Sequence, residues 1–589
     1  MRPATASAAA SLAGVHPSRH GATRGAERLH VPDVASLGDA LAHHARTQPD
    51  AIAMHFVGFD DQVTSLTYAE LLARAQRVAT TLAARGVGRG HAVVCCFDTG
   101  PALLATFLGC SLLGAAPVLT EMPLGSTRTR IWAEAVARMA QIAGARALVV
   151  DDDFRAAADE VARSCELPLL GPADFSSSAA APPALPALGA DDIAFIQFSS
   201  GTTGAPKGIS VTHGALLANA RAMGARAGFV RGDATVGWLP LYHDMGLVGV
   251  TLTPLLHGLP VALMSPMAFL FKPERWLWAL HHFRATATCA PNFAYQLCAK
   301  RLTPAATAGL DLGSLHLAFN GAEQVQRDTL TAFAARFAPH GFRPEAMYPV
   351  YGMAEAALGV AFPDPGAPPR VDLVDRDALT RDGVAAPGCS DLGTIAFVSV
   401  GRPLDGYEVR IAGGDGEPLP ERRQGQILLR GPSITRAYVN APDDSAAAFR
   451  DGWLCTGDLG YLADGELFVC GRSKDLIIKA GRNYHPHTFE SSAARVPGVR
   501  VGCVAAIAAR NAEAGTEDVV VVFETRVTDR AELAALKAAV EAQIQRDVGL
   551  RPERLIAVPP QALPKTSSGK VARSAVVALV VGGRLREPA

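Results

Sequence analysis

The residue types at 199–208 are those of a loop that binds phosphate. The run reads Ser-Ser-Gly-Thr-Thr-Gly-Ala-Pro-Lys-Gly and follows an apolar stretch that predicts a strand. Glycines let the backbone approach an anion closely, clustered N–H and hydroxyl groups donate hydrogen bonds to it, and a lysine adds charge. The run is not a Walker A loop, because Pro206 stands where that loop has a glycine before its lysine. We expect phosphate contacts from Ser199, Ser200, Gly201, Thr202, Thr203, Gly204 and Lys207.

Further short motifs follow this loop along the chain. They are Asn-Gly-Ala-Glu at 320–323, Tyr-Gly-Met-Ala-Glu at 351–355, Thr-Gly-Asp at 456–458, Gly-Arg-Ser-Lys-Asp at 471–475 and Pro-Lys-Thr-Ser-Ser-Gly-Lys at 564–570. Their order is that of the adenylate-forming superfamily of acyl-CoA synthetases, nonribosomal adenylation domains and luciferases, which the chain resembles from about residue 30 to 580. The resemblance implies that ATP and Mg²⁺ are used to join a carboxylate to AMP.

The resemblance also implies a role for each matching residue. Glu355 would hold Mg²⁺ against the phosphates, and Asp458 would accept hydrogen bonds from the ribose hydroxyls with help from Arg472. Lys570 would bridge the carboxylate and the α-phosphate, and with Glu355 and Thr203 it makes up the expected catalytic set. Around the adenine we expect Gly321, Ala322, Glu323, Tyr351 as a stacking face, Gly352 and Met353. Core packing is the alternative for the tyrosine.

Two other segments resemble the fatty acyl-AMP ligase branch of this superfamily. They read Leu-Pro-Leu-Tyr-His-Asp-Met-Gly-Leu at 239–247 and Cys-Ala-Pro-Asn-Phe-Ala-Tyr at 289–295. In that branch they shape the acyl site, so His243, Asn292, Phe293 and Tyr295 are candidate substrate contacts. The histidine is equally well interpreted as a hydrogen-bonded core residue, and the two aromatic residues as helix packing. No aspartate stands at 290–297 to hold an ammonium group, which favours an acid with an uncharged tail.

An insertion separates two of the motifs. Between Glu355 and Gly401 lie 45 residues, and those at 363–393 are rich in Pro, Gly and Asp with little periodicity, so they are either disordered or functional. Fatty acyl-AMP ligases carry their distinguishing insertion here, at 361–395, where it resembles a clamp on domain motion. We therefore expect transfer of the acyl group to the phosphopantetheine thiol of a separate acyl carrier protein, for polyketide, lipopeptide or lipid synthesis. The alternative is a fatty acyl-CoA ligase of the same fold, with the loop as decoration.

Strand and helix patterns alternate through the first 400 residues and predict parallel sheets with covering helices, an α/β fold. A small β-rich unit follows residue 401, and the last hundred residues form an α+β unit with a long helix at 530–547. The resemblance then divides the chain into an N-terminal domain at 31–472, a hinge at 473–475 around Lys474, and a mobile C-terminal domain at 476–589 that carries the catalytic lysine.

Composition excludes other classes. The chain has 589 residues and a formal net charge of −1, so no global field would recruit nucleic acid. Ten scattered cysteines predict reduced thiols and a cytoplasmic protein. The longest uncharged stretch, 245–271, is interrupted by proline and glycine, which predicts core elements rather than a membrane span. Residues 1–30 are expected to be a disordered tail, although their composition superficially matches a transit peptide.

Overall fold

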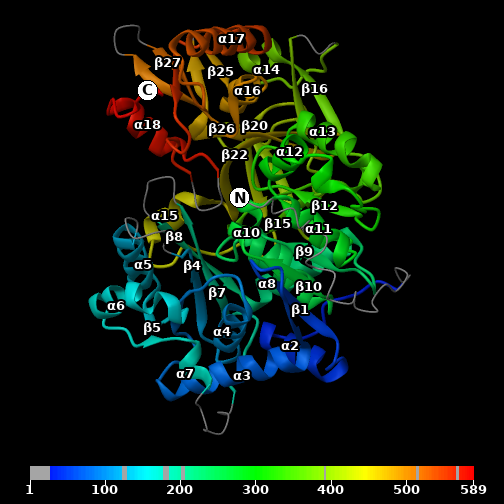
Figure 1. Ribbon diagram of the computed structural model, residues 1–589, viewed down its shortest axis with the longest axis vertical. Coiled ribbons are helices and arrows are strands. Elements are labelled where there is room, and N and C mark those ends of the chain that lie inside the picture. The colour runs from blue at the N-terminus through cyan, green and yellow to red at the C-terminus, as the bar shows by residue number, and fades with distance from the viewer. Residues whose placement is uncertain are drawn as a thin grey trace, which may run out of the picture.

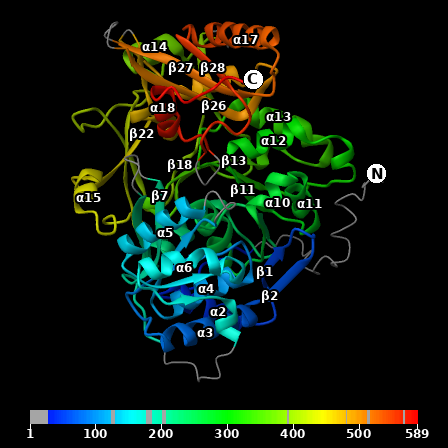
Figure 2. The same ribbon diagram turned by 60° about the vertical axis from the view of Figure 1, so that its left-hand side comes forward.

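The structure is a computed structural model, and it describes residues 27–122, 129–176, 185–200, 206–389, 393–479, 481–511, 516–565 and 570–588. Most of the chain forms helix-covered sheets, and the C-terminal unit, residues 476–588, lies at one end of the long axis (Figure 1). In a view turned by 60°, α17 (Arg530–Val548) still lies at that end, beyond α12 (Asn292–Arg301) and α13 (Arg327–Phe337) (Figure 2). The predicted α/β fold is confirmed.

One sheet has six strands in the spatial order β6-β5-β3-β4-β7-β8. Neighbouring strands are parallel except for β7 and β8. Every residue of β3 and β4 is buried, as expected for a parallel sheet covered on both faces. The strands are Leu169–Leu170 (β6), Ala145–Val150 (β5), Ala92–Cys96 (β3), Ala116–Thr120 (β4), Ile193–Ser200 (β7) and Pro206–Thr212 (β8), and the contacting helices are Pro101–Leu112 (α4), Thr129–Ala143 (α5) and Arg155–Ser164 (α6), with Tyr68–Ala84 (α3) on α4.

The other large sheet has the order β13-β12-β11-β9-β10-β1-β2 and is parallel except for β1 and β2. Its strands are Met347–Pro349 (β13), Leu317–Asn320 (β12), Ala287–Ala290 (β11), Thr235–Gly237 (β9), Val261–Met264 (β10), Ile52–Val57 (β1) and Val63–Thr67 (β2). The motifs at 289–295, 320–323 and 351–355 begin at or just beyond the carboxyl ends of three adjacent strands. Because those ends meet at one edge, the sheet gathers the three motifs there.

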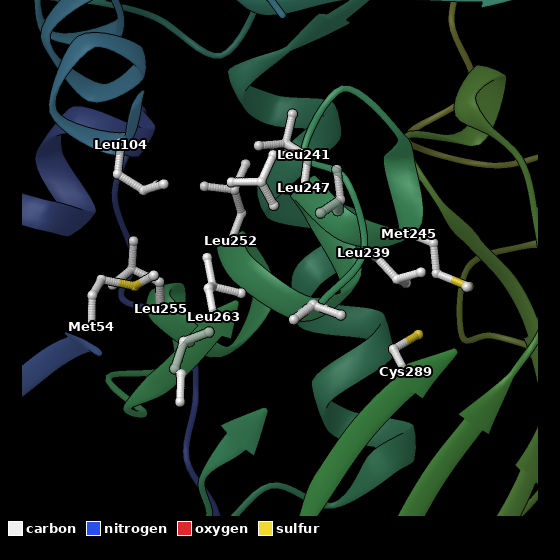
Figure 3. Close-up of a cluster of buried hydrophobic side chains, with 14 of the residues drawn as sticks. Met54, Leu104, Leu239, Leu241, Met245, Leu247, Leu252, Leu255, Leu263 and Cys289 are labelled. Carbon is white, nitrogen blue, oxygen red and sulfur yellow. The ribbon is translucent and has the colours of Figure 1, made fainter. Parts of the chain in front are cut away.

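The uncharged stretch at 245–271 forms several short elements that are mostly buried, with Met267, Leu270 and Phe271 exposed near its end. The elements are a π-helix Met245–Leu252 (η4), α9 (Thr253–Leu256), β10 and α10 (Pro266–Phe271). Figure 3 shows Met245 and Cys289 on one side of this region, with Leu252, Leu255 and Leu263 on the other. Among the described residues no helix is both long and apolar enough to cross a bilayer. The interpretation as core elements is confirmed.

A β-rich unit and the C-terminal unit complete the molecule. The first consists of Glu408–Ala412 (β19), Gly425–Arg430 (β20), Phe449–Arg450 (β21), Trp453–Ala463 (β22) and Glu466–Arg472 (β23), and beside it lie Tyr351–Gly352 (β14), Gly359–Phe362 (β15) and Arg402–Pro403 (β18). The C-terminal unit holds Ile477–Lys479 (β24), Arg482–Tyr484 (β25), Pro486–Ala493 (α16), Val499–Asn511 (β26), Thr516–Thr525 (β27), α17, Arg554–Val558 (β28) and Arg573–Val581 (α18).

The insertion is ordered where the structure describes it. Val371–Asp375 (β16) pairs antiparallel with Thr394–Val398 (β17), and Arg376–Asp382 (α14) lies between them; these residues, 371–398, are called the clamp hairpin below. The Asp375 carboxylate caps the helix by accepting from the Ala378 N–H at 2.8 Å. The insertion has little sequence periodicity because it forms a short two-stranded ribbon, and its described residues are ordered.

The expected tail ends earlier than residue 30. Residues 1–26 lie outside the described part of the chain, but the Leu29 N–H donates to the Phe229 carbonyl at 2.9 Å and Arg28 forms a bridge with Val230. The last residues of the expected tail are therefore attached to the fold.

Candidate active site

A cavity of about 1350 Å³ lies where the large sheets, the β-rich unit and the C-terminal unit meet. Residues from all the described motifs line it, among them Ser199, Lys207, Glu355, Asp458 and Lys570. The lining also includes the apolar side chains of Met223, Phe229, Pro254, Phe319, Leu358 and Phe362, which are called the apolar part of the cavity below. The motifs that are scattered along the sequence therefore share one space.

Lys207 is the described charged group of the expected phosphate loop. Its ammonium lies 2.6 Å from Asp444 Oδ1 and 5.0 Å from the centre of the Tyr438 ring. Ser199 precedes it on β7 and also lines the cavity. The side chain of Ser200 and the four expected residues Gly201, Thr202, Thr203 and Gly204 lie outside the described part, so their predicted contacts stay predictions.

Glu355 is held in a short 3₁₀ turn, Ala354–Ala356, at the wall of the cavity. Its Oε1 accepts from the Tyr438 hydroxyl at 2.9 Å, and its carbonyl accepts from the Thr435 N–H at 2.7 Å. Burial raises the pKa of this carboxyl above its ordinary value, because the charged form loses hydration. A cation bound at this carboxylate would favour its charged form and so lower the pKa again.

Asp458 has two fixed partners. It lies opposite Arg472 in the pairing of β22 and β23, with 3.1 Å between Arg472 Nε and Asp458 Oδ1. The Tyr351 hydroxyl donates to Oδ2 at 2.7 Å. The nearby Asp458 charge is the main reason that the pKa of Arg472 lies above its ordinary value. The sequence indicated the aspartate and the arginine, but not that Tyr351 bonds to the carboxylate rather than serving only as a ring face.

The 320–323 motif forms a tight bend beside the cavity. A Cβ on Gly321 would come within 2.9 Å of the Val350 side chain, and Ala322 has a φ of 66°, a left-handed conformation that is costly for alanine. Such strain is found where backbone position serves function. Glu323 lines the cavity, and its Oε1 accepts from the Phe293 N–H at 2.6 Å at the start of α12. Gly352 and Met353 line the cavity as well.

Lys570 reaches this bend from the C-terminal unit. Its ammonium donates a hydrogen bond to the carbonyl of Ala322. Burial lowers the pKa of Lys570 below its ordinary value, whereas the charges of Glu323 and Asp244 oppose that change. Lys474 also lines the cavity, just after β23, and burial lowers its pKa too. Residues 566–569, which precede Lys570, lie outside the described part.

The four candidate substrate contacts occupy different environments. His243 lines the cavity, and burial lowers its pKa to about 4, so it is neutral at pH 7. Phe293 lines the cavity and contacts Trp238. Asn292 lies at the wall, but its amide bonds to Thr329. The structure instead places Tyr295 in the core, fully buried, with its hydroxyl donating to the Phe319 carbonyl at 2.8 Å. As a result, the aromatic pair is split: one ring faces the cavity and the other packs behind it.

Two cavity residues were not singled out from the sequence. Tyr438, which bonds to Glu355, lies in no motif, and only the fold brings it there. Asp244 stands inside the 239–247 segment and lines the cavity, with Oδ1 accepting from the Met245 N–H at 2.7 Å. Its position next to His243 was the available signal.

Comparison with known proteins defines the class. The chain matches the AMP-binding enzyme family over residues 41–439, and it belongs to this family of ligases. The predicted resemblance is thereby confirmed.

Its relatives include proteins named for fatty-acid activation. The chain is 32% identical to JamA of Moorena producens, a medium-chain-fatty-acid–[acyl-carrier-protein] ligase by name, over 92% of this chain and 95% of JamA. It is 34% identical to FadD21 of Mycobacterium tuberculosis, whose name describes a fatty-acid–CoA ligase, over 92% and 97%. A solved structure from a study of fatty acyl-adenylate ligases of E. coli and L. pneumophila has a TM-score of 0.88 and 33% identity, over 94% of this chain and 99% of that chain.

Proposed function

We propose that this protein activates a medium- or long-chain fatty acid with ATP and passes the acyl group from AMP to the thiol of a separate acyl carrier protein. The observation that carries the first part is the single cavity in which nucleotide-motif residues, an apolar pocket and Lys570 meet. The names of JamA and FadD21 agree on a fatty acid as the substrate and differ in the acceptor. A polyketide, lipopeptide or lipid pathway would supply the carrier.

The polar side of the cavity suits a magnesium nucleotide. Asp458, fixed by Tyr351 and Arg472, would accept the ribose hydroxyls, and Lys207 would contact the phosphates. No set of three or more histidine, cysteine or acidic side chains in the described chain is arranged to hold a metal. Mg²⁺ often binds through one carboxylate and substrate phosphates, which fits Glu355. When bound, the ion would neutralise phosphate charge.

In the proposed adenylation, a carboxylate oxygen of the fatty acid attacks the α-phosphorus of ATP. The new C(O)O–P bond forms as the bond to the pyrophosphate oxygen breaks, and pyrophosphate leaves. Negative charge builds on the α-phosphate, and the Lys570 ammonium would stabilise it from beside the 320–323 bend. His243 would contact the carboxylate, and Phe293 the start of the chain. In the same proposal, Lys474, which lines the cavity, would be the hinge about which the C-terminal domain moves.

The apolar part of the cavity favours an alkyl chain. Its lining includes Met223, Phe229, Phe319 and Phe362, and none of these carries charge. Burying each methylene in such a pocket contributes about 0.8 kcal/mol, so binding should strengthen with chain length until the pocket is filled.

The clamp hairpin supports a carrier protein over CoA. Arg376 on α14 donates to the Asp547 carbonyl at 3.0 Å, and Asp377 pairs with Arg482 of the C-terminal unit at 3.1 Å. Phe397 of β17 lies 6.3 Å from His485 and 5.9 Å from His487, measured between ring centres. In both overall views α14 lies close to α17 of the C-terminal unit (Figures 1 and 2). These contacts would oppose the swing that forms a CoA thioester site.

One assay tests both parts. The protein is incubated with ATP, Mg²⁺ and a panel of fatty acids, and acyl-AMP and thioesters are measured by mass spectrometry with either CoA or a holo carrier protein. We expect acyl-AMP in every case and transfer to the carrier alone. Efficient acyl-CoA formation would make the protein a CoA ligase. A variant with Arg376→Ala and Asp377→Ala should gain CoA transfer while its adenylation rate is unchanged.

A further inference from the structure

Arg573 is a charged residue of the cavity wall that the proposed mechanism does not use. It is the first residue of α18 and follows Lys570 closely in the chain. Its Nε donates to Glu490 Oε1 at 2.9 Å, and its Nη2 donates to Glu490 Oε2 at 2.7 Å. Its Nη1 donates to Asp475 Oδ2 at 3.1 Å. All the guanidinium nitrogens are therefore bonded to carboxylates of this chain.

These contacts give Arg573 one orientation. The guanidinium fork bonds both oxygens of Glu490, and such a bidentate pair is specific in its geometry. Glu490 lies on α16, and its Oε1 also accepts from the Ala506 N–H of β26 at 3.0 Å. The nearby charge of Glu490 is the main reason that the pKa of Arg573 lies above its ordinary value, and Asp475 acts in the same direction. The start of α18 is thus held by α16 and by the 3₁₀ turn Ser473–Asp475.

The chain between Arg573 and Lys570 is held by the backbone as well. The Ala572 N–H donates to the Pro564 carbonyl at 2.9 Å, and the residues that adjoin this bond form an antiparallel bridge. These contacts close the base of the segment that carries Lys570. Because the base is closed and α18 begins at Arg573, the position of the Lys570 backbone depends on the position of Arg573.

The two neighbours of Lys474 are bonded to different parts of the molecule. Ser473 Oγ donates to the Gly457 carbonyl of β22 at 3.1 Å. Asp475, on the other side, is bonded to Arg573 of α18. In the proposed function the C-terminal domain moves about Lys474, so Ser473 stays with the β-rich unit while Asp475 moves with α18. One ion pair, between residues 98 positions apart in the chain, therefore joins the moving side of the hinge to the start of α18.

We propose that Arg573 is a positioning residue, which bonds the hinge at Asp475 to the segment that carries Lys570 and so sets where the lysine ammonium lies in the cavity. This inference rests on the proposed function, because Lys570 must take part in adenylation. The ammonium reaches the carbonyl of Ala322 in this arrangement. A displacement of about 1 Å at a reacting group can lower a rate about 100-fold, so the bond between hinge and segment matters for the rate.

The test compares Arg573→Ala with wild type in the adenylation half-reaction. We expect kcat to fall about 10- to 100-fold, with the KM for ATP changed less than about twofold. Arg573→Lys should restore part of the rate, because an ammonium pairs with a carboxylate but lacks the fork that bonds both oxygens. A raised KM with an unchanged kcat would indicate direct contact with ATP and would overturn the inference.

Lys479→Ala is the matched control in the same unit. Lys479 Nζ lies 2.9 Å from Glu553 Oε1, and the other Glu553 oxygen accepts from the Val519 N–H of β27 at 2.7 Å. The described residues that line the cavity do not include Lys479. Its loss should lower the urea midpoint as Arg573→Ala does but leave kcat at the wild-type value. An equal fall of kcat in both variants would mean that general loosening of the C-terminal unit is the cause, against the inference.

A double-mutant cycle tests whether the arginine acts through the lysine. In a Lys570→Ala background, Arg573→Ala should cause no further fall in adenylation, whereas an independent role would lower both backgrounds equally and contradict positioning. If Arg573→Ala does not fold, Asp475→Asn decides the question. It should lower kcat without raising the KM for ATP, and an unchanged kcat would overturn the inference. If Lys570→Ala itself keeps full activity, it is the proposed function that fails.

Discussion

The C-terminal unit touches the rest of the chain in several regions, and two of them differ in kind. At the cavity, Lys570 makes a hydrogen bond to one backbone carbonyl, that of Ala322. At the clamp hairpin, the contact combines charged and neutral hydrogen bonds with a buried aromatic centre around Phe397 and His485. The lysine contact can break and re-form at low cost, whereas the hairpin contact would be lost only with exposure of its buried rings.

This difference indicates that the two contact regions have different roles. The clamp hairpin is also bonded to residues of the β-rich unit. Its Asp372 carboxylate accepts from the Tyr461 hydroxyl at 2.8 Å and pairs with Arg422 at 3.1 Å. In the proposed function, the hairpin would hold the C-terminal unit over the cavity, and the lysine would supply chemistry without carrying the interface. Variants in the two regions should affect different measurements.

The largest effect is expected at Phe397, which is fully buried among Tyr461, His485 and His487. Phe397→Ala removes a core ring and leaves a cavity, at a cost of about 3–5 kcal/mol in the free energy of unfolding. Urea unfolding measures this loss, with Phe333→Ala in another core region as the control for ring removal alone. Only Phe397→Ala should also speed hydrogen exchange in β25. Equal exchange in both variants would contradict the clamp.

Lys570→Ala is expected to act on chemistry alone. Adenylation should fall about 100- to 1000-fold, which corresponds to roughly 2.7–4 kcal/mol of transition-state stabilisation. ATP affinity and the urea midpoint should stay near wild type, because a single hydrogen bond to a backbone carbonyl contributes little to the stability of the interface. Pyrophosphate release and ATP titration measure the two quantities. A large loss of stability would show that the lysine contact also carries the interface.

The two regions also differ in how far the sequence predicted them. The cavity motifs could be found in the sequence because each is a short continuous run of residues, such as those that contain Asp458 and Arg472. The fold then places these two residues opposite each other on paired strands. Tyr438 was missed, since its bond to Glu355 depends on packing of segments far apart in sequence. The hairpin contacts had no local signature either: Asp377 meets Arg482 only through the fold. Alternation of strand and helix patterns was enough for the sheets, and the helix predicted at 530–547 is α17, Arg530–Val548.

Acidification should weaken the hairpin contact more than the cavity contact. Burial lowers the pKa of His485 to about 3, against 6.5 ordinarily, and its Nδ1 has no partner among the described residues. The unfolded state therefore binds more protons between pH 6.5 and 3, so stability is present at neutral pH and is lost as pH falls below 6.5. The slope is about 1.4 kcal/mol per pH unit. Thermal unfolding at pH 7.5 and 5.5 measures it, and His485→Gln should flatten the dependence.

The smallest effect is expected from the charged rim of the hairpin contact. Arg482 pairs with Asp377 at 3.1 Å, with 38% and 53% of the two side chains exposed, so solvent screens most of the attraction. Arg482→Ala should lower the free energy of unfolding by only about 0.2–1 kcal/mol, with less effect in 0.5 M salt. Urea titration at both salt concentrations measures it, and Arg430→Ala, at another exposed ion pair, is the control. A loss as large as that of Phe397→Ala would mean that the charged rim, and not the aromatic centre, holds the C-terminal unit.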